Sequence, residues 1–195
     1  MIQGTIAFHG HWCPGLAIGI RAAELALQEF GRSSDEEIVA VVETDMCGVD
    51  AIQYLTGCTF GKGNLIYKDY GKNAFTFYRR SDDKALRLMT KNNVFGDTQP
   101  ELGRLNRKMQ EKSLTGEEEQ KWRSIRETLS RRIMETPVSG LFDVKKPAEI
   151  TPKKARMLQS IVCDECKEAA MESRIRRFQG LELCIPCFEK HEKRF

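Results

Sequence analysis

Two Cys-x-x-Cys pairs near the C-terminus constrain this chain more than any other feature of its sequence. The pairs are Cys163 with Cys166 and Cys184 with Cys187, and seventeen residues separate them. This spacing is typical of four-cysteine zinc sites, in which the thiolates close a tetrahedral cage around one ion. The alternative is a pair of disulfides, which a reducing cytoplasm would not maintain. The sequence therefore predicts a structural zinc ion in the tail.

The segment between the pairs has the pattern of a β-hairpin. Strands are expected at 173–178 and 181–184, joined by the turn Gln179-Gly180, and a short helix is expected from Phe188 to the end. Knuckle, hairpin and helix in this order resemble a treble-clef zinc finger. His191 is a spare donor, but four cysteines complete the shell, so we expect it on the surface.

The length of 195 residues suggests one ordinary domain with a small appendage, and we place the boundary at Met157, giving domains 1–157 and 158–195. No run of about 18 apolar residues and no basic leader are found, so we expect a cytoplasmic protein with no membrane partner. The odd count of seven cysteines leaves Cys13, Cys47 and Cys58 outside the zinc cage, as free thiols.

Charge is unevenly distributed along the chain. The net charge is only +3, but residues 1–78 hold 5 basic and 9 acidic side chains, which leaves 26 basic and 19 acidic beyond. Four zinc-bound thiolates would remove most of the positive charge of the tail. Nucleic acid is therefore a weakly supported partner.

Residues 1–80 alternate between helix and strand patterns. The apolar residues of 15–30 recur at steps of four and three, which predicts an amphipathic helix. The β-branched run at 38–42 predicts a buried central strand. The other elements expected here are a helix at 50–56 and a hairpin of strands 64–70 and 74–80.

Beyond residue 80 the sequence becomes charged and is expected to be mainly helical. Helices are predicted at 83–91, 101–111 and 117–135, the last with a capping box formed by Thr115 and Glu118. A short strand is expected at 141–144. The larger domain is therefore predicted to be α+β.

Histidine and cysteine are concentrated just before the first predicted helix. His9, His11 and Cys13 lie within five positions, and an extended segment would point all three to one side. Cys13 would also cap the helix, where the helix dipole favours a thiolate. Such residues bind a metal or act as a nucleophile, although a turn with incidental polar residues is the alternative.

Cys47 occupies an equivalent position between the strand at 38–42 and the helix at 50–56. Sites gather where strand ends face helix N-termini, so Cys13 and Cys47 could meet in space. Either could equally be a small buried apolar residue, which is the commoner fate of a free cysteine.

A glycine-rich loop at 57–64 resembles a phosphate loop but lacks its spacing, so nucleotide hydrolysis is not expected. The loop could still approach a metal or anion, with Lys62 as the anion contact and Cys58 as a further ligand, or it could be an ordinary turn.

Three motifs in order resemble the FmdE family, named after a component of formylmethanofuran dehydrogenase. They are FHGHWCPGLA at 8–17, ETDMCGVDAIQ at 43–53 and GCTFGKGNL at 57–65. The resemblance implies a thioredoxin-like mixed β-sheet core flanked by helices, a treble-clef finger and a homodimer. It also implies a link to a molybdenum enzyme of methanogenesis, whose subunits would be partners. The motif histidines and cysteines of the family fall on His9, His11, Cys13 and Cys47.

Three functions follow. The leading hypothesis is a metal-binding FmdE-like protein with an accessory or redox role related to molybdenum formylmethanofuran dehydrogenase. In it, His11, Cys13 and Cys47, helped by His9 or Cys58, hold a second transition metal, for which zinc, iron or copper suits the donors. The second is a thiol enzyme with Cys13 and Cys47 in its active site, a histidine base and the glycine loop as oxyanion cradle. The third is a regulatory module whose zinc finger binds nucleic acid or protein.

Overall fold

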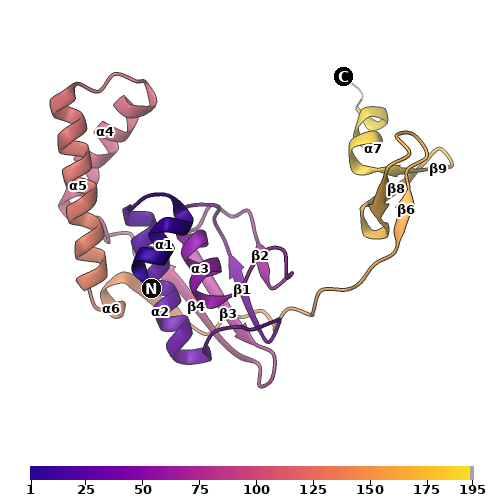
Figure 1. Cartoon of the computed structure of the whole chain (residues 1–195), viewed down its shortest axis with the longest axis horizontal. Helices are drawn as coiled ribbons and strands as arrows, with labels where there is room; N and C mark the ends of the chain where they lie inside the picture. The colour runs from indigo at the N-terminus through magenta and orange to yellow at the C-terminus, as the bar shows by residue number, and fades with distance from the viewer. Residues whose placement is uncertain (194–195) are drawn as a thin grey trace. The chain divides into compact units, whose positions relative to one another are not determined.

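The computed structural model describes residues 1–193 and contains two compact units, Met1–Lys154 and Ala155–Phe195 (Figure 1). The first unit is a mixed α+β domain, and the second is a small unit built around four cysteines. Within the described residues, no helix is long and apolar enough to cross a membrane.

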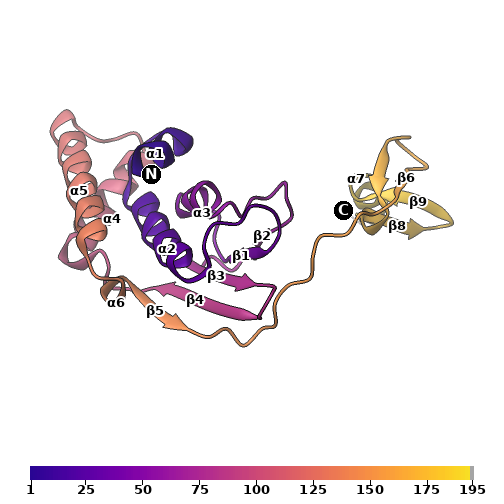
Figure 2. The same ribbon diagram turned by 60° about the horizontal axis from the view of Figure 1, so that its bottom comes forward.

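A five-stranded sheet forms the base of the first unit, in the order β2-β1-β3-β4-β5 (Figure 2). β1 pairs with β2 in parallel, and the remaining neighbours are antiparallel. All residues of β1 are buried, as expected for a central strand. The strands are β1 (Ile38–Val42), β2 (Leu65–Tyr67), β3 (Ala74–Arg79), β4 (Lys84–Thr90) and β5 (Phe142–Lys145).

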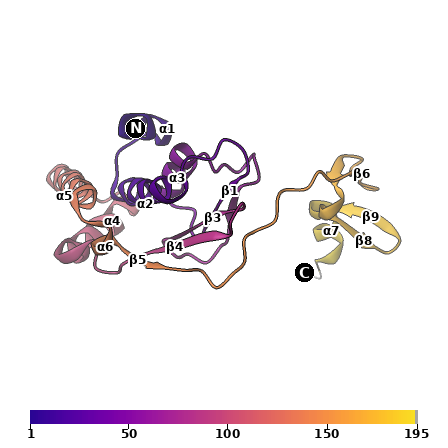
Figure 3. The same ribbon diagram turned by 90° about the horizontal axis from the view of Figure 1, so that it is seen from below.

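Helices cover one face of this sheet, with α2 and α3 lying over strands β3 and β4 (Figure 3). The alternation of side chains along a strand separates the two faces. Phe75, Phe77 and Leu88 join the main core with the helices, whereas Val39 and Val41 belong to a smaller cluster on the other face. The helices of this layer are α1 (Ile2–His9), α2 (Pro14–Phe30) and α3 (Gly48–Thr56).

A helical hairpin extends the first unit beside α2 (Figures 1 and 3). Leu129 and Ile133 of its second helix are buried in the main core. The predicted capping box is present, because Thr115 accepts from the Glu118 amide and the Glu118 carboxylate accepts from the Thr115 amide. The elements of this region are η1 (Gly96–Thr98), α4 (Gln99–Gln110), α5 (Gly116–Glu135) and α6 (Val138–Leu141).

The helix predicted at 83–91 is wrong, because these residues form strand β4. Lys, Ala, Leu, Arg and Met favour helix, which explains the error. However, Leu86 and Leu88 alternate with Arg87, a period of two that suits a sheet. The leucines contact the core, and Arg87 forms an ion pair with Glu43 at 2.8 Å on the other face.

The hairpin predicted between 64–70 and 74–80 is also wrong, because β1 lies between β2 and β3. The connecting segment passes over the end of β1, where the Lys68 amide donates to the Val42 carbonyl and the Lys72 amide to the Glu43 carbonyl. A fully apolar strand such as β1 needs a neighbour on each edge, which a local hairpin would not supply. β3 instead forms its hairpin with β4.

The second unit carries two small two-stranded sheets and a final helix. The predicted hairpin is present as β8 and β9, with Gln179 and Gly180 in the turn at φ 49° and 84°. Phe178 and Phe188 pack edge to face at 5.7 Å. The expected closing helix is found, although its predicted last residues, 194 and 195, lie outside the described part. The elements are β6 (Ser160–Val162), β7 (Ala169–Met171), η2 (Glu172–Arg174), β8 (Ile175–Phe178), β9 (Leu181–Cys184) and α7 (Ile185–Glu192).

Candidate metal centres

The ends of three helices supply the candidate donors of the first unit. His9 is the last residue of α1, and Gly10 ends that helix in the left-handed conformation at φ 93°. His11 lies in the connecting loop, and Cys13 is the N-cap of α2, where its Sγ accepts from the Leu16 amide at 3.3 Å. Cys47 is the N-cap of α3.

The close crossing of α2 and α3 brings the two cysteines together. Gly19 and Gly48 face each other, and a Cβ added to Gly19 would lie 2.3 Å from the Gly48 carbonyl oxygen. A Cβ added to Gly15 would lie 3.2 Å from the Cβ of Cys47. Glycine is therefore required for the backbones to approach so closely, and this approach places the N-termini of both helices side by side.

His9, His11, Cys13 and Cys47 form one cluster, in which one donor atom from each lies within 4.8 Å of the others. We call these four residues the core cluster. The Cys13 Sγ lies 3.9 Å from the His9 Nε2. A tetrahedral zinc site with ordinary Zn–S and Zn–N bonds would place these two atoms about 3.6 Å apart. The donor set therefore fits a metal of this size with little movement.

Asp50 orients His9 toward the cluster. The His9 Nδ1 and the Asp50 Oδ2 lie 2.7 Å apart, which leaves the Nε2 facing Cys13. A carboxylate behind a histidine in this way fixes the ring and raises its basicity as a ligand. Asp50 was missed by the sequence analysis. The signal was its position three residues after Cys47, on the same side of the α3 N-terminus.

The two cysteines of the core cluster share one proton. A hydrogen bond from Cys47 lowers the pKa of Cys13 to about 6, and the same bond with burial strongly raises the pKa of Cys47. Burial lowers the pKa of His9, but the bonds to Asp50 and Cys47 outweigh it, so the net shift is upward. Without metal, the cluster therefore carries a thiolate at neutral pH.

The mechanism of convergence differs from the one expected. Residues 8–15 are not an extended segment: α1 runs to His9, and a turn at Gly10 follows. The helical preference of residues 2–9 was not recognised. His9 and Cys13 meet because α1 ends where α2 begins, not through the alternation of a strand.

Two further expected site residues lie away from the core cluster. Cys58 is fully buried past the far end of α3, where its Sγ lies 3.5 Å from the Ile38 carbonyl oxygen and burial raises its pKa. The expectation that Cys58 joins the other donors is therefore corrected, because α3 separates it from Cys47. Lys62 lines a different pocket with Arg32 and Gly57.

A pocket of about 660 Å³ opens beside the core cluster. His9, Cys47 and Asp50 form one wall, and Met46, Phe60 and Tyr67 supply apolar surface. Because His11 is exposed while Cys13 is only 2% exposed, the cluster has one open side and one closed side.

The second unit holds its four cysteines in one cluster, again with the donor atoms within 4.8 Å of one another. Cys166 Sγ and Cys184 Sγ lie 3.7 Å apart, close to the edge of about 3.8 Å expected for a zinc–thiolate tetrahedron. The Cys184 amide donates to the Cys163 Sγ at 3.3 Å and lowers the pKa of Cys163 to about 6. Burial raises the pKa of Cys187 to about 12. His191 contacts Glu165 at 2.6 Å on the surface, outside the cluster.

The fold and the two clusters define a metal-binding protein with a zinc-finger unit. A family model described as FmdE, Molybdenum formylmethanofuran dehydrogenase operon, matches residues 8–143, and the chain belongs to this family. A second model, described as Prokaryotic dksA/traR C4-type zinc finger, matches residues 158–193.

Two relatives place the chain among known proteins. A solved structure of an FmdE-like protein of tungsten formylmethanofuran dehydrogenase type, from Syntrophus aciditrophicus, is 25% identical, with a TM-score of 0.61. The match covers 98% of this chain and 92% of that one. A probable S-adenosyl-L-methionine-binding protein of Archaeoglobus fulgidus is 34% identical over 92% of this chain. The chain spans only 50% of that longer relative.

Proposed function

We propose that the core cluster binds one transition metal and that the protein serves as an accessory or redox component. Thiolate with imidazole suits zinc, iron or copper better than magnesium or calcium. The observation that carries the proposal is the pairing of His9 with Asp50, which turns the free Nε2 toward Cys13. An orienting carboxylate of this kind accompanies most metal-binding histidines.

The uneven burial of the core cluster supports a reactive site over a purely structural one. Cys13 is buried, Cys47 is half-buried, and His11 is exposed. Three inner donors would hold the ion, and displacement of His11 would open a coordination position toward solvent. The bound metal would then supply Lewis-acid or redox chemistry to a molecule in the adjoining pocket.

The finer assignments made from the sequence belong to the same proposal. We propose zinc as the ion of the four-cysteine cluster, a treble-clef topology for the finger, a thioredoxin-like core and a homodimer. The description of the matching family supports a role beside a molybdenum enzyme that handles formylmethanofuran, and the resemblance to the solved FmdE-like protein supports it too.

A thiol enzyme that uses Cys13 is the second candidate, and its pKa of about 6 favours it. His9 lies within 3.9 Å as a potential base. However, the Cys13 side chain is only 2% exposed, whereas a nucleophile must reach its substrate. Burial beside imidazole suits a ligand better.

Alkylation with iodoacetamide separates these two functions. We expect Cys13 to be unmodified at pH 7 in the metal-loaded protein, because coordination blocks the thiolate. After chelation it should react, with a rate that rises around pH 6 and then levels, because the pKa of Cys13 is lowered to that value. Mass spectrometry of the labelled peptides distinguishes Cys13 from Cys58. Rapid labelling of Cys13 in the loaded protein would favour the thiol enzyme.

Removing the carboxylate behind His9 tests the metal site directly. We expect Asp50→Asn to weaken metal binding at the core cluster by about 10- to 100-fold, the usual cost of losing an outer-shell partner. Competition with a chromophoric chelator measures the affinity. Asp45→Asn is the matched control, since Asp45 lines the same pocket but has no contact with His9. Equal affinity in the Asp50 variant and the wild type would contradict the proposed ligand role of His9.

A further inference from the structure

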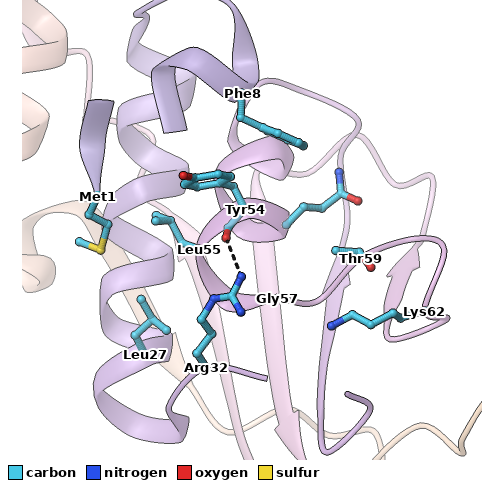
Figure 4. Close-up of a pocket in the computed structure, with 10 residues that line it drawn as sticks. Met1, Phe8, Leu27, Arg32, Tyr54, Leu55, Gly57, Thr59 and Lys62 are labelled. Atoms are coloured by element: carbon cyan, nitrogen blue, oxygen red, sulfur yellow. Dashed lines mark hydrogen bonds between the residues drawn. The ribbon is translucent and has the colours of Figure 1, made fainter. Parts of the chain in front are cut away.

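A second pocket, of about 700 Å³, lies at the C-terminal end of α3 (Figure 4). We call it the Arg32–Lys62 pocket. Its walls are mostly apolar and include Phe8, Leu27 and Leu55. No function assigned above uses it.

Two cations are found among the residues that line this pocket, and no carboxylate is among them. Within residues 1–193, neither Arg32 nor Lys62 forms an ion pair. The Arg32 Nη2 donates to the Tyr54 carbonyl at 3.4 Å, which fixes the guanidinium at the end of α3 and leaves its other N–H groups available. Figure 4 shows the Lys62 side chain directed toward the Arg32 side of the pocket.

An aromatic pair forms the opposite part of the pocket. The rings of Phe8 and Tyr54 lie 5.5 Å apart and are inclined by 34°. Phe8 is 55% exposed, so most of its ring has no protein neighbour. A flat apolar group could pack against this ring. The combination of aromatic wall and unpaired cations matches a ligand with an aromatic body and an anionic end.

The Arg32–Lys62 pocket also adjoins the pocket of the core cluster, because Gln53 lines both. Asp50 at the start of α3 and Gly57 at its end mark the two pockets. At 1.5 Å per residue they lie about 10 Å apart along the helix. A ligand anchored at Arg32 could therefore extend along α3 toward the metal donors.

We propose that the Arg32–Lys62 pocket binds an aromatic molecule carrying a carboxylate or phosphate. Arg32 and Lys62 hold the anionic group, Phe8 and Tyr54 hold the aromatic body, and the far end points toward the core cluster. The direction toward the cluster rests on the proposed metal function, whereas the anion pocket itself does not.

Titration of the full chain with phenyl phosphate, phenylacetate and neutral benzyl alcohol tests the proposal, followed by NMR. We expect at least one of the two anions to bind more tightly than benzyl alcohol, and Lys62→Gln to weaken that anion about tenfold. Binding of phosphate alone or carboxylate alone identifies the anionic group. Lys62→Arg should restore binding, and Lys146→Gln, at an exposed lysine outside the pocket, is the matched control.

Arg32→Gln is a second variant, with its thermal unfolding measured because Arg32 also bonds the end of α3. Anion binding unchanged in both the Lys62→Gln and Arg32→Gln proteins would overturn the proposal. So would an equal loss in Lys146→Gln.

Cobalt(II) locates the ligand relative to the core cluster. In cobalt-loaded protein we expect broadened phenyl phosphate or phenylacetate resonances, and less broadening in a Cys13→Ser/Cys47→Ser variant that retains cobalt only in the finger. Anion binding that persists in this variant leaves the pocket standing even if the metal function fails. Equal broadening in both cobalt-loaded proteins, with cobalt bound at the core cluster of the wild type, would overturn the location beside the cluster.

Discussion

Replacing Cys163 with serine is expected to unfold the second unit and leave the first unit folded. The unit has only about forty residues, a size at which a hydrophobic core alone rarely suffices. Its buried centre consists of three cysteines and Leu183, so the metal cage is most of its core. Structural zinc contributes about 10–16 kcal/mol of binding free energy in small fingers. Loss of one thiolate removes a large part of this.

Dispersion of the amide resonances in a two-dimensional NMR spectrum measures the effect, with zinc content measured in parallel. Resonances of 158–193 should collapse toward random-coil positions, while those of the first unit stay in place. His191→Gln is the control, because His191 contacts Glu165 and not the cysteines. A Cys163→Ser protein with full zinc content and a dispersed finger spectrum would contradict the four-thiolate cage.

Gly19→Ala is expected to destabilise the first unit and impair the core cluster together. The added Cβ would lie 2.3 Å from the Gly48 carbonyl oxygen and 2.5 Å from its Cα, so the backbones of α2 and α3 must separate. Overpacking of this kind costs about 1–3 kcal/mol, and more where no flexible side chain can yield. The same movement separates the helix N-termini that carry Cys13 and Cys47.

Urea unfolding measures the stability, and chelator competition measures the core metal affinity. Gly103→Ala is the matched control, since Gly103 lies within α4 and a Cβ there meets nothing within 4 Å. That change should stabilise the protein slightly, by up to about 1 kcal/mol. Unchanged stability and metal affinity in Gly19→Ala would show that the close crossing of α2 and α3 does not position the cysteines.

Local sequence patterns predicted most single elements of the fold but not their pairing. The apolar run of β1, the amphipathic α2 and the capped α5 were all recognised, because periodicity and caps are local signals. The place of β2 was not, because its partner is chosen by the exposed edges of β1 and not by the neighbouring turn. β4 was mistaken for a helix because its residues favour helix while its packing requires a strand.

The candidate site was anticipated through its cysteines and histidines but not through the residues that arrange them. Cys13 and Cys47 were noted for their positions before helices. Asp50 and Gly19 carry no motif, and their importance depends on the packing of α3 against α1 and α2. Arg32 was likewise invisible, because the pocket it shares with Lys62 is assembled from distant segments.

Metal stoichiometry in matched variants tests the central claim most directly, namely that two sulfur atoms and imidazole from separate helices share one ion. After loading with cobalt(II), we expect two tightly bound ions per chain, one for each cluster. We expect one in Cys13→Ser/Cys47→Ser, with the loss of part of the thiolate-to-cobalt absorption. A wild-type chain that binds a single ion, and the same single ion after both core cysteines are replaced, would contradict the account.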